Sequence, residues 1–410
     1  MTDRRANARR IPRWSELRPY LRTQPLRRTP LERRLAGAAD VGDLRDIARR
    51  HTPRAVFDYV DGGAEREASL RRSREAFERI EFAPSVLRDV SAVDPSTTIL
   101  GRRADLPLVF APTGFTRLMH HEGEPAVARV AGRTRIPYVL STMGTTSPED
   151  LAAASPDADR WFQLYLWRDR GASEALIERA RAAGFRTLML TVDTPVAGSR
   201  QRDIRNGFSI PPALTVRTLA DMALHPGWWF DKLTTEPLTF ASLGAWHGTI
   251  AEMIDKMFDP TLDFDDLAWL RRIWSGPLVV KGIQTVEDAR RVVDAGADGL
   301  IVSNHGGRQL DRAPVPIEQL AAIAAAVGDR VEVYVDGGVM NGGDVVAAVA
   351  MGARAALVGR AYLYGLMAGG EAGVQRVADI LRREVIRTMA LIGVTDVAGL
   401  TPDRARFRDR

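Results

Sequence analysis

The sequence predicts an α/β protein folded as a (β/α)8 TIM barrel. From Pro107 onward, short apolar runs alternate with amphipathic stretches of helical length. Eight such runs follow one another, which is the number of parallel strands that closes a barrel. The alternative is a doubly wound dinucleotide-binding sheet, in which a G-x-G-x-x-G turn follows the first strand. No such turn follows the first run of this chain. The eight predicted strands are residues 108–111, 138–141, 161–166, 187–192, 278–280, 300–303, 331–335 and 355–358.

The barrel is preceded by a basic arm and a helical entry. Residues 1–34 hold eleven arginines and three acidic residues, and no apolar core follows them, so they are not a secretory signal. We expect residues 1–40 to be a solvated, partly disordered arm, with contact to an anionic lipid surface as the alternative. Apolar residues then recur at helical spacing over residues 41–82, with a break at Gly62-Gly63. We therefore predict one domain, residues 41–400, with a helical entry at 41–106 and the barrel at 107–400.

A long insertion interrupts the alternation after the fourth predicted strand. No strand candidate occurs between Asp193 and Leu278, and a connection of that length is usually functional. The insertion, about residues 205–265, carries an apolar helical stripe at 216–223 and the aromatic residues Trp228, Trp229, Phe230 and Trp246. It is either a lid packed over the barrel or an interfacial anchor that rests on lipid headgroups.

Composition excludes several classes of protein. The chain has no cysteine, which excludes disulfides and thiolate metal sites. Zinc-type histidine spacing is absent, and the adjacent His120 and His121 cannot easily face one metal, so no metal is expected. No nucleic-acid-binding motif occurs, and no apolar stretch is long enough to span a membrane. A cytoplasmic location is compatible with this composition.

The segment Ser303-Asn-His-Gly-Gly-Arg-Gln-Leu-Asp311 is the most informative in the chain. It follows a buried strand, and active sites of (β/α)8 barrels lie at the carboxyl ends of the strands. His305 and Arg308 therefore place a base beside a cation, which suits proton removal next to a bound carboxylate. Asp193, at the end of the fourth strand, can orient the imidazole. Arg200 can hold the same carboxylate from another side, although salt bridges to surface acids are the alternative role for such arginines.

Other strand ends indicate an anionic ligand. Glycine-rich loops follow the seventh and eighth strands, at Asp336-Gly337-Gly338 and Gly359-Arg360, where barrels commonly bind phosphate. Lys281 ends the buried fifth strand, and a buried lysine is costly unless it faces an anion. A flavin, whose N1 becomes negative on reduction, would be such an anion.

Four motifs of this chain resemble those of the FMN-dependent α-hydroxy-acid dehydrogenases and oxidases. They are 303–311, Phe-Gln-Leu-Tyr at 162–165, Leu-Thr-Val-Asp-Thr-Pro at 190–195 and Val-Lys-Gly at 280–282. The resemblance runs from about Asp43 to Leu400. The segment 52–59 and the tryptophan-containing fourth loop look most like the quinone-linked L-lactate dehydrogenase branch, whose fourth loop associates with membranes.

This resemblance implies a role for each residue of the predicted site. The catalytic residues would be His305, Asp193 and Lys281. The substrate-binding residues would be Tyr59, Tyr165, Arg200, Arg308 and Met143, the last shaping the side-chain pocket. The FMN-binding residues would be Pro112, Thr113, Gly114, Ser141, Gln163, Thr191, Lys281, Ser303, Asp336, Gly337, Gly338, Gly359 and Arg360. Met340 stands where the family often has a second phosphate-binding arginine, so phosphate binding would depend more on Arg360 and backbone amides.

The implied reaction is FMN-dependent oxidation of an (S)-2-hydroxy acid, most simply L-lactate to pyruvate. Electrons would pass to a quinone or another carrier, because Gly114 stands where oxygen-reactive members commonly have alanine. The resemblance further implies a homotetramer in peripheral contact with the inner face of the cell membrane through residues 205–265. Two alternatives remain open: a flavin enzyme of the same fold that oxidises an amine in redox-cofactor biosynthesis, and a non-redox, phosphate-binding barrel isomerase.

Overall fold

The computed structural model describes residues 10–21, 29–207, 220–221, 223–236, 238 and 258–408. The start of the predicted arm and most of the predicted insertion, including Trp246 and the stripe at 216–219, lie outside the described residues.

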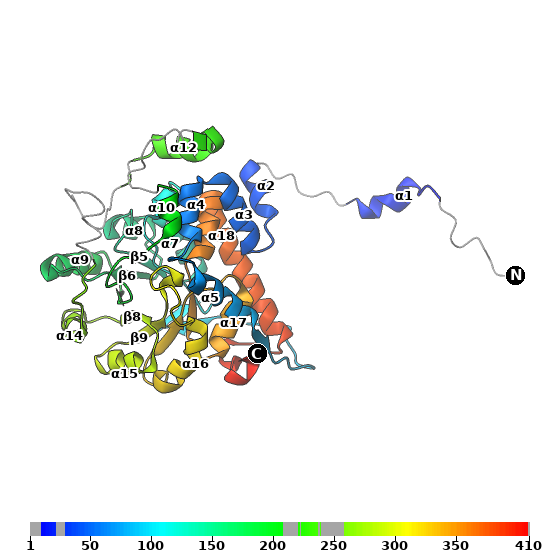
Figure 1. Ribbon diagram of the computed structural model, residues 1–410. Coiled ribbons are helices and arrows are strands. Elements are labelled where there is room, and N and C mark those ends of the chain that lie inside the picture. Colours follow the sequence, from blue (N-terminus) through cyan, green and yellow to red (C-terminus); the bar gives the residue numbers. More distant parts are fainter. Residues whose placement is uncertain are drawn as a thin grey trace.

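Eight parallel strands close into a barrel, which confirms the predicted fold (Figure 1). Each strand pairs with the next one along the chain, and β11 returns to β4 to close the ring. The strands are β4 (Leu108–Phe110), β5 (Tyr138–Ser141), β6 (Arg160–Leu164), β7 (Thr187–Thr191), β8 (Leu278–Ile283), β9 (Gly299–Val302), β10 (Glu332–Val335) and β11 (Ala355–Val358).

Helices follow the strands and cover the outside of the barrel (Figure 1). Several begin at a capping side chain: Ser147, Asp169, Thr285 and Asn341 each accept a bond from an amide of the first turn. The helices of the barrel are α6 (Thr116–Met119), α7 (Gly123–Thr134), α8 (Pro148–Ala154), α9 (Arg170–Ala182), α10 (Gln201–Arg205), α12 (Pro226–Thr234), α14 (Phe264–Ile273), α15 (Val286–Asp294), α16 (Pro316–Val327), α17 (Gly342–Ala350) and α18 (Arg360–Leu391).

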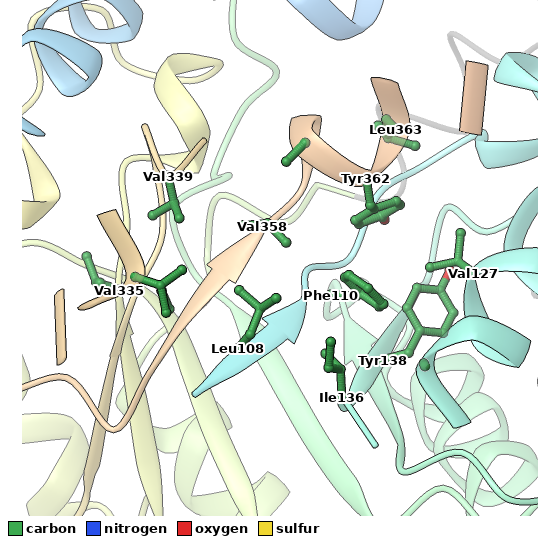
Figure 2. Close-up of a cluster of buried hydrophobic side chains, with 14 of the residues drawn as sticks. Leu108, Phe110, Val127, Ile136, Tyr138, Val335, Val339, Val358, Tyr362 and Leu363 are labelled. Atoms are coloured by element: carbon green, nitrogen blue, oxygen red, sulfur yellow. The ribbon is translucent and has the colours of Figure 1, made fainter. Parts of the chain in front are cut away.

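Alternate residues of each strand pack in two separate cores. On β4, Leu108 and Phe110 face the helices, whereas Val109 joins Trp161 and Tyr334 inside the barrel. Figure 2 shows part of the outer core, where the ring of Phe110 lies 5.4 Å from that of Tyr362 of α18. The barrel interior is therefore filled by side chains, so a ligand can bind only at an end of the barrel.

A hairpin occupies the amino-terminal end of the barrel. Strands β2 (Thr97–Ile99) and β3 (Arg102–Ala104) pair antiparallel, and Ile99 and Ala104 belong to the interior core. These three-residue strands are too short to give a recognisable pattern, and the sequence did not predict them. Strands β1 (Ile80–Phe82) and β12 (Ala405–Phe407) pair separately. The ligand cavity accordingly lies at the other end, where the strands terminate.

The predicted helical entry consists of α3 (Val41–His51), α4 (Arg54–Asp61) and α5 (Ala68–Glu78). Asp61 fixes the end of α4, because it accepts bonds from Arg45 at 2.6 Å, Arg202 at 2.9 Å and Tyr364 at 2.8 Å. This arrangement holds Tyr59, on the same helix, at the barrel mouth.

Part of the predicted basic arm is helical, as α1 (Trp14–Leu17) and α2 (Pro30–Ala36). Leu35 of α2 is buried in the outer core and would contact a side chain added at Gly369 of α18. The last residues of the arm thus pack on the barrel. Among the residues that the structure describes, no helix is long and apolar enough to cross a membrane.

Candidate active site

A cavity of about 1040 Å³ opens at the carboxyl ends of the strands. Most of the residues predicted for the site line it, and they come from loops far apart in sequence. Gln163, Asp193 and Ser303 do not line the cavity; they lie behind the lining and bond to residues that do. The lining residues from the predicted set are Tyr59, Pro112, Thr113, Gly114, Ser141, Met143, Tyr165, Thr191, Arg200, Lys281, His305, Arg308, Asp336, Gly337, Gly338, Gly359 and Arg360.

His305 and Asp193 form a hydrogen-bonded pair. The imidazole Nδ1 lies 2.9 Å from Asp193 Oδ1, which leaves Nε2 as the free ring nitrogen. The backbone amide of His305 donates to Ser303 Oγ at 3.0 Å, and its φ of +57° lies in the left-handed region. Such a conformation is unusual for a residue with a side chain and is often found at functional sites.

Asp193 is buried against β8, and a glycine makes this possible. A Cβ at Gly282, whose φ is +114°, would lie 2.7 Å from the Asp193 Cβ. Burial alone would raise the pKa of Asp193, but the adjacent His305 and Lys281 hold it below its ordinary value. An ionised carboxylate at this position accepts the bond from the imidazole and holds the ring in one orientation.

Two arginines flank the ring of Tyr59. The guanidinium carbons of Arg308 and Arg200 lie 4.9 Å and 5.5 Å from the ring centroid. Arg308 is held by the carbonyl of Tyr59 at 2.6 Å, and Arg200 by Asp203 at 3.0 Å. Burial, with Arg200 nearby, lowers the pKa of Arg308 to about 10. Two neighbouring cations in a cavity attract an anion, and a planar carboxylate matches their geometry.

Lys281 is a buried cation with a buried partner. Its Nζ donates to Ser303 Oγ at 3.0 Å and lies 3.1 Å from Asp336 Oδ2. Burial by itself would lower the pKa of Lys281, but Asp336 and Asp193 raise it, so the ammonium stays charged. The other oxygen of Asp336, Oδ1, is buried without a protein partner. It remains available to accept a bond from a ligand.

Polar side chains continue from Lys281 around the ends of three neighbouring strands. Ser141 on β5 donates to Gln163 Oε1 at 3.0 Å, and Gln163 on β6 donates to Thr191 on β7 at 3.0 Å. All three are buried. A buried polar row of this kind can bond the heteroatoms of a flat ring system.

The far end of the cavity lies between the seventh and eighth loops and α5. Gly337 and Gly338 have φ of +89° and +94°, and a Cβ at Gly338 would lie 2.6 Å from the carbonyl of Ser73. Arg360 donates to the carbonyls of Val60, Gly62 and Gly306 at 2.7 to 2.9 Å. It therefore joins the eighth loop to α4 and to the His305 turn.

Sequence reasoning missed Arg74 at this end of the cavity. The Arg74 guanidinium donates to the carbonyl of Gly338 at 2.6 Å and to Asp344, the first-turn carboxylate of α17. It thus places a cation beside the loop in which Met340 replaces the expected arginine. Arg74 lies on α5, which precedes the barrel, so the pattern of residues at the strand ends could not indicate it.

These residues fit FMN. The unpartnered Oδ1 of Asp336 suits a ribityl hydroxyl, the buried Lys281 suits the ring end that becomes negative, and positive-φ glycines with Arg360 suit a phosphate. Gly114 leaves little room beside the ring position, because a Cβ there would lie 2.8 Å from Met143 Cβ. The cavity is also larger than most single-ligand sites, so it can hold a cofactor and a small substrate.

His120, His121 and Asp231, which include the two adjacent histidines considered in the sequence, lie close together outside this cavity. Their potential ligand atoms all lie within 4.8 Å of one another. The two imidazole rings are stacked at 4.5 Å with planes 27° apart, and His121 Nδ1 lies 3.2 Å from Asp231 Oδ2.

The inserted segment contacts the barrel through α12. Trp228 is buried, and Lys232 donates from Nζ to the carbonyl of Arg117 at the start of α6. Phe230 and Leu233 on the same helix are 67% and 72% exposed, and Leu224 just before it is 76% exposed. The predicted aromatic cluster is therefore divided, with one part packed on the barrel and another facing solvent.

Comparison with known proteins agrees with the site. A family model described as FMN-dependent dehydrogenase matches residues 48–407. A putative L-lactate dehydrogenase of Mycobacterium tuberculosis is 58% identical over 394 residues, covering 96% of this chain and 95% of that protein. An (S)-mandelate dehydrogenase of Pseudomonas putida is 40% identical over 368 residues, covering 89% of this chain and 93% of the relative.

A solved structure has the same architecture. The crystal structure of a monotopic membrane protein, (S)-mandelate dehydrogenase, superposes with a TM-score of 0.87 at 38% identity, covering 91% of this chain and 100% of that one. With a family model over most of the chain, extensive identity to these relatives and a cavity that fits FMN, this chain belongs to the FMN-dependent dehydrogenases, flavoprotein oxidoreductases that act on 2-hydroxy acids.

Proposed function

We propose that this protein oxidises L-lactate, or a closely related (S)-2-hydroxy acid, to the 2-oxo acid and passes the electrons to a quinone or another carrier. The observation that carries the proposal is the His305–Asp193 pair beside two arginines that share one aromatic ring. A base next to a carboxylate site is what oxidation at the carbon bearing the hydroxyl requires. The 58% identity to a protein named as a putative L-lactate dehydrogenase supports the choice of lactate.

In this proposal Arg308 and Arg200 bind the substrate carboxylate, and the hydroxyls of Tyr59 and Tyr165 orient the substrate. The free Nε2 of His305 removes a proton from the substrate. Asp193 accepts the Nδ1–H bond throughout, so the imidazolium that forms is stabilised without moving. Burial, with Asp193 nearby, raises the pKa of Tyr165 above its ordinary value, so its hydroxyl stays a hydrogen-bond donor.

The residues proposed to hold FMN divide into a ring group and a phosphate group. Pro112, Thr113, Gly114, Ser141, Gln163, Thr191, Lys281 and Ser303 surround the ring, and Asp336, Gly337, Gly338, Gly359 and Arg360 hold the ribityl and phosphate end. When bound, FMN supplies an acceptor for two electrons from the substrate. The side chains position the substrate beside it and remove the proton.

The alternative of a non-redox, phosphate-binding isomerase has no support, because the chain belongs to a family of FMN-dependent dehydrogenases. Oxidation of an amine would use the same flavin residues, but no contact in the site favours an amine over a carboxylate with a hydroxyl. The two arginines favour a substrate with a carboxylate, because Arg308 is held by backbone carbonyls and Arg200 by the single carboxylate of Asp203.

Anaerobic mixing with L-lactate tests the proposal directly. The flavin absorbance should bleach within the mixing experiment and return on addition of a soluble quinone, but only slowly with oxygen. If the flavin stays oxidised with lactate and with longer 2-hydroxy acids, the proposed reaction is wrong. Rapid recovery with oxygen alone would identify an oxidase instead.

We further propose that α12 contacts a membrane surface at the inner face of the cell membrane. Phe230, Leu233 and Leu224 are exposed apolar side chains on the inserted segment, and such residues insert at the headgroup boundary. The described similarity to a monotopic membrane protein supports this. Cosedimentation with vesicles should fall in Phe230→Glu with Leu233→Glu, whereas Leu310→Glu, an exposed leucine on the sixth loop, should behave as the wild type. The homotetramer remains a prediction.

A further inference from the structure

The inserted segment returns to the barrel at Phe258, six residues before α14 begins at Phe264. Its ring lines the active-site cavity and meets the ring of Tyr165 edge to face, with centroids 5.5 Å apart and planes at 84°. Tyr165 is itself inside the site, since the charges of Asp193, Arg200 and Arg308 all act on its hydroxyl. Phe258 is therefore next to the place where the substrate would lie.

The residue after Phe258 is clamped to the same loop that carries Tyr165. Asp259 Oδ2 accepts from Arg170 Nη1 at 2.7 Å, and Arg170 also binds Asp266 of α14 through two contacts of 2.8 Å. The Asp259 side chain is 2% exposed, and its other oxygen is bonded by Thr261. Phe258 thus contacts Tyr165 in the β6–α9 loop, and Asp259 is held by Arg170 at the start of α9, so the ring is restricted from two sides.

Met143 supplies another apolar surface of the cavity. It is buried, lines the cavity, and is held by its amide, which donates to Ser141 Oγ at 3.1 Å. A thioether is adaptable in shape, whereas a clamped phenyl ring is not. Between these two apolar groups, the rigid one decides how large a substrate side chain can be.

We propose that Phe258 is a specificity-determining residue that limits the side chain of the 2-hydroxy acid, and that Asp259 is a positioning residue that holds it through Arg170. The inference rests on the proposed oxidation of 2-hydroxy acids and adds the substrate class. The site takes short, apolar side chains, because a longer chain must displace a ring that two loops hold. Removing the ring makes room without touching the arginines or His305.

The test compares L-lactate with (S)-2-hydroxyoctanoate in wild type, Phe258→Ala and Phe258→Trp. Phe258→Ala should raise the ratio of kcat/KM for hydroxyoctanoate to that for lactate by at least about tenfold, the scale of apolar pocket discrimination, and Phe258→Trp should lower it. Leu391→Ala, at an exposed position at the end of α18 and outside the cavity, is the control and should keep the wild-type ratio. A ratio within about threefold of wild type in both Phe258 variants overturns the inference.

Product binding separates this inference from the proposed reaction. The dissociation constants of pyruvate and 2-oxooctanoate, read from the flavin spectrum, need no turnover, and their ratio should shift in the same direction. A protein that binds these acids with the shifted ratio but oxidises no hydroxy acid would contradict the reaction alone. Unshifted binding in a protein that turns over lactate would contradict the role of Phe258 alone.

Asp259→Asn tests positioning. Loss of the charge should loosen Phe258, so the hydroxyoctanoate-to-lactate ratio should move part of the way toward that of Phe258→Ala. Arg170→Gln should do the same, because it removes the other half of the clamp. If both variants lower kcat/KM equally for the two substrates and leave the ratio unchanged, the clamp is merely structural and the positioning role is wrong.

Discussion

The barrel mouth holds a buried lysine and helix α12 a partly buried one, and the two lysines have different partners. Lys281 at the end of β8 has Asp336 at 3.1 Å and Ser303 at 3.0 Å, and these contacts keep its pKa raised. Lys232 on α12 bonds the carbonyl of Arg117 and lies 5.5 Å from the ring centroid of Trp228. Burial, together with the Arg117 charge, lowers its pKa to about 7.

The neighbouring polar atoms differ less clearly between the two places. At the barrel mouth, Asp193, Ser141 and Gln163 have side-chain partners, but Oδ2 of Asp193 and Oδ1 of Asp336 are buried without a protein partner. On α12, the indole nitrogens of Trp228 and Trp229 are buried without a protein partner. Two buried opposite charges that pair hold each other in one geometry, whereas a charge held by a carbonyl and an aromatic ring has no paired opposite charge to offset the cost of burial. The first suits a catalytic site, and the second suits a segment that also meets another surface.

The largest expected effect is at the barrel mouth. His305→Gln should lower kcat with L-lactate by about 10³-fold or more, since a positioned general base contributes about 10² to 10⁴. FMN content, measured by absorbance of the purified protein, should stay near wild type because His305 is not among the residues proposed to hold the cofactor. Turnover close to wild type would remove His305 from the mechanism.

Substitution in the buried pair Lys281–Asp336 should have the next largest effect, in this case on the free energy of unfolding. Lys281→Met should lower the free energy of unfolding of the apoprotein by about 3 to 5 kcal/mol, because it leaves a buried carboxylate without its partner. Adding Asp336→Asn removes that charge and should recover much of the loss, as measured by denaturant titration. If the double variant is no more stable than Lys281→Met, the carboxylate is not the cause.

Substitutions at the proposed phosphate end of the cavity should have a smaller effect. Arg360→Gln should weaken FMN binding by about tenfold, or about 1.4 kcal/mol, while leaving riboflavin binding nearly unchanged. Arg74→Gln is the informative comparison, because Arg74 lies beside the loop that carries Met340. A larger loss of FMN relative to riboflavin in Arg74→Gln than in Arg360→Gln would transfer the phosphate role to α5.

The smallest effect concerns the pH dependence of α12 docking. The pKa of Lys232 is about 7 when docked and about 10.4 when free, so between these values the undocked state binds more protons. Docking should therefore strengthen as pH rises through this window, and below about pH 7 it carries the full penalty of burying the ammonium. Arg117 opposes the charged form, and Glu124 and Asp231 favour it.

Hydrogen exchange of the α12 amides, corrected for intrinsic rates, measures this docking. Protection in the wild type should grow several-fold from about pH 6 to about pH 9, and Lys232→Met should show protection that does not depend on pH. Phe230→Ala keeps the lysine and should follow the wild type. An unchanged pH dependence in Lys232→Met would show that another group controls docking.

The sequence predicted the barrel because each strand is a short apolar run followed by a helical stretch, and both patterns are local. Strand ends then identify the residues at the mouth, which is why His305, Arg308, Lys281 and Asp193 could be named together. The β2–β3 hairpin was missed because its strands are only three residues long, and Arg74 was missed because it acts through contacts with a distant loop. Phe258 was missed for the same reason, since only the fold brings it to Tyr165.

What the sequence by itself determined is the order of the strands and the chemical groups at their ends, because hydrophobic periodicity and glycine-rich turns are properties of neighbouring residues. What only the tertiary structure decided is which groups touch. The 2.9 Å contact of His305 with Asp193 and the clamp of Arg170 on Asp259 join loops that are far apart in the chain. The pKa of Lys281 and that of Lys232 depend on burial and on the charges nearby, and both depend on every segment that packs around these side chains.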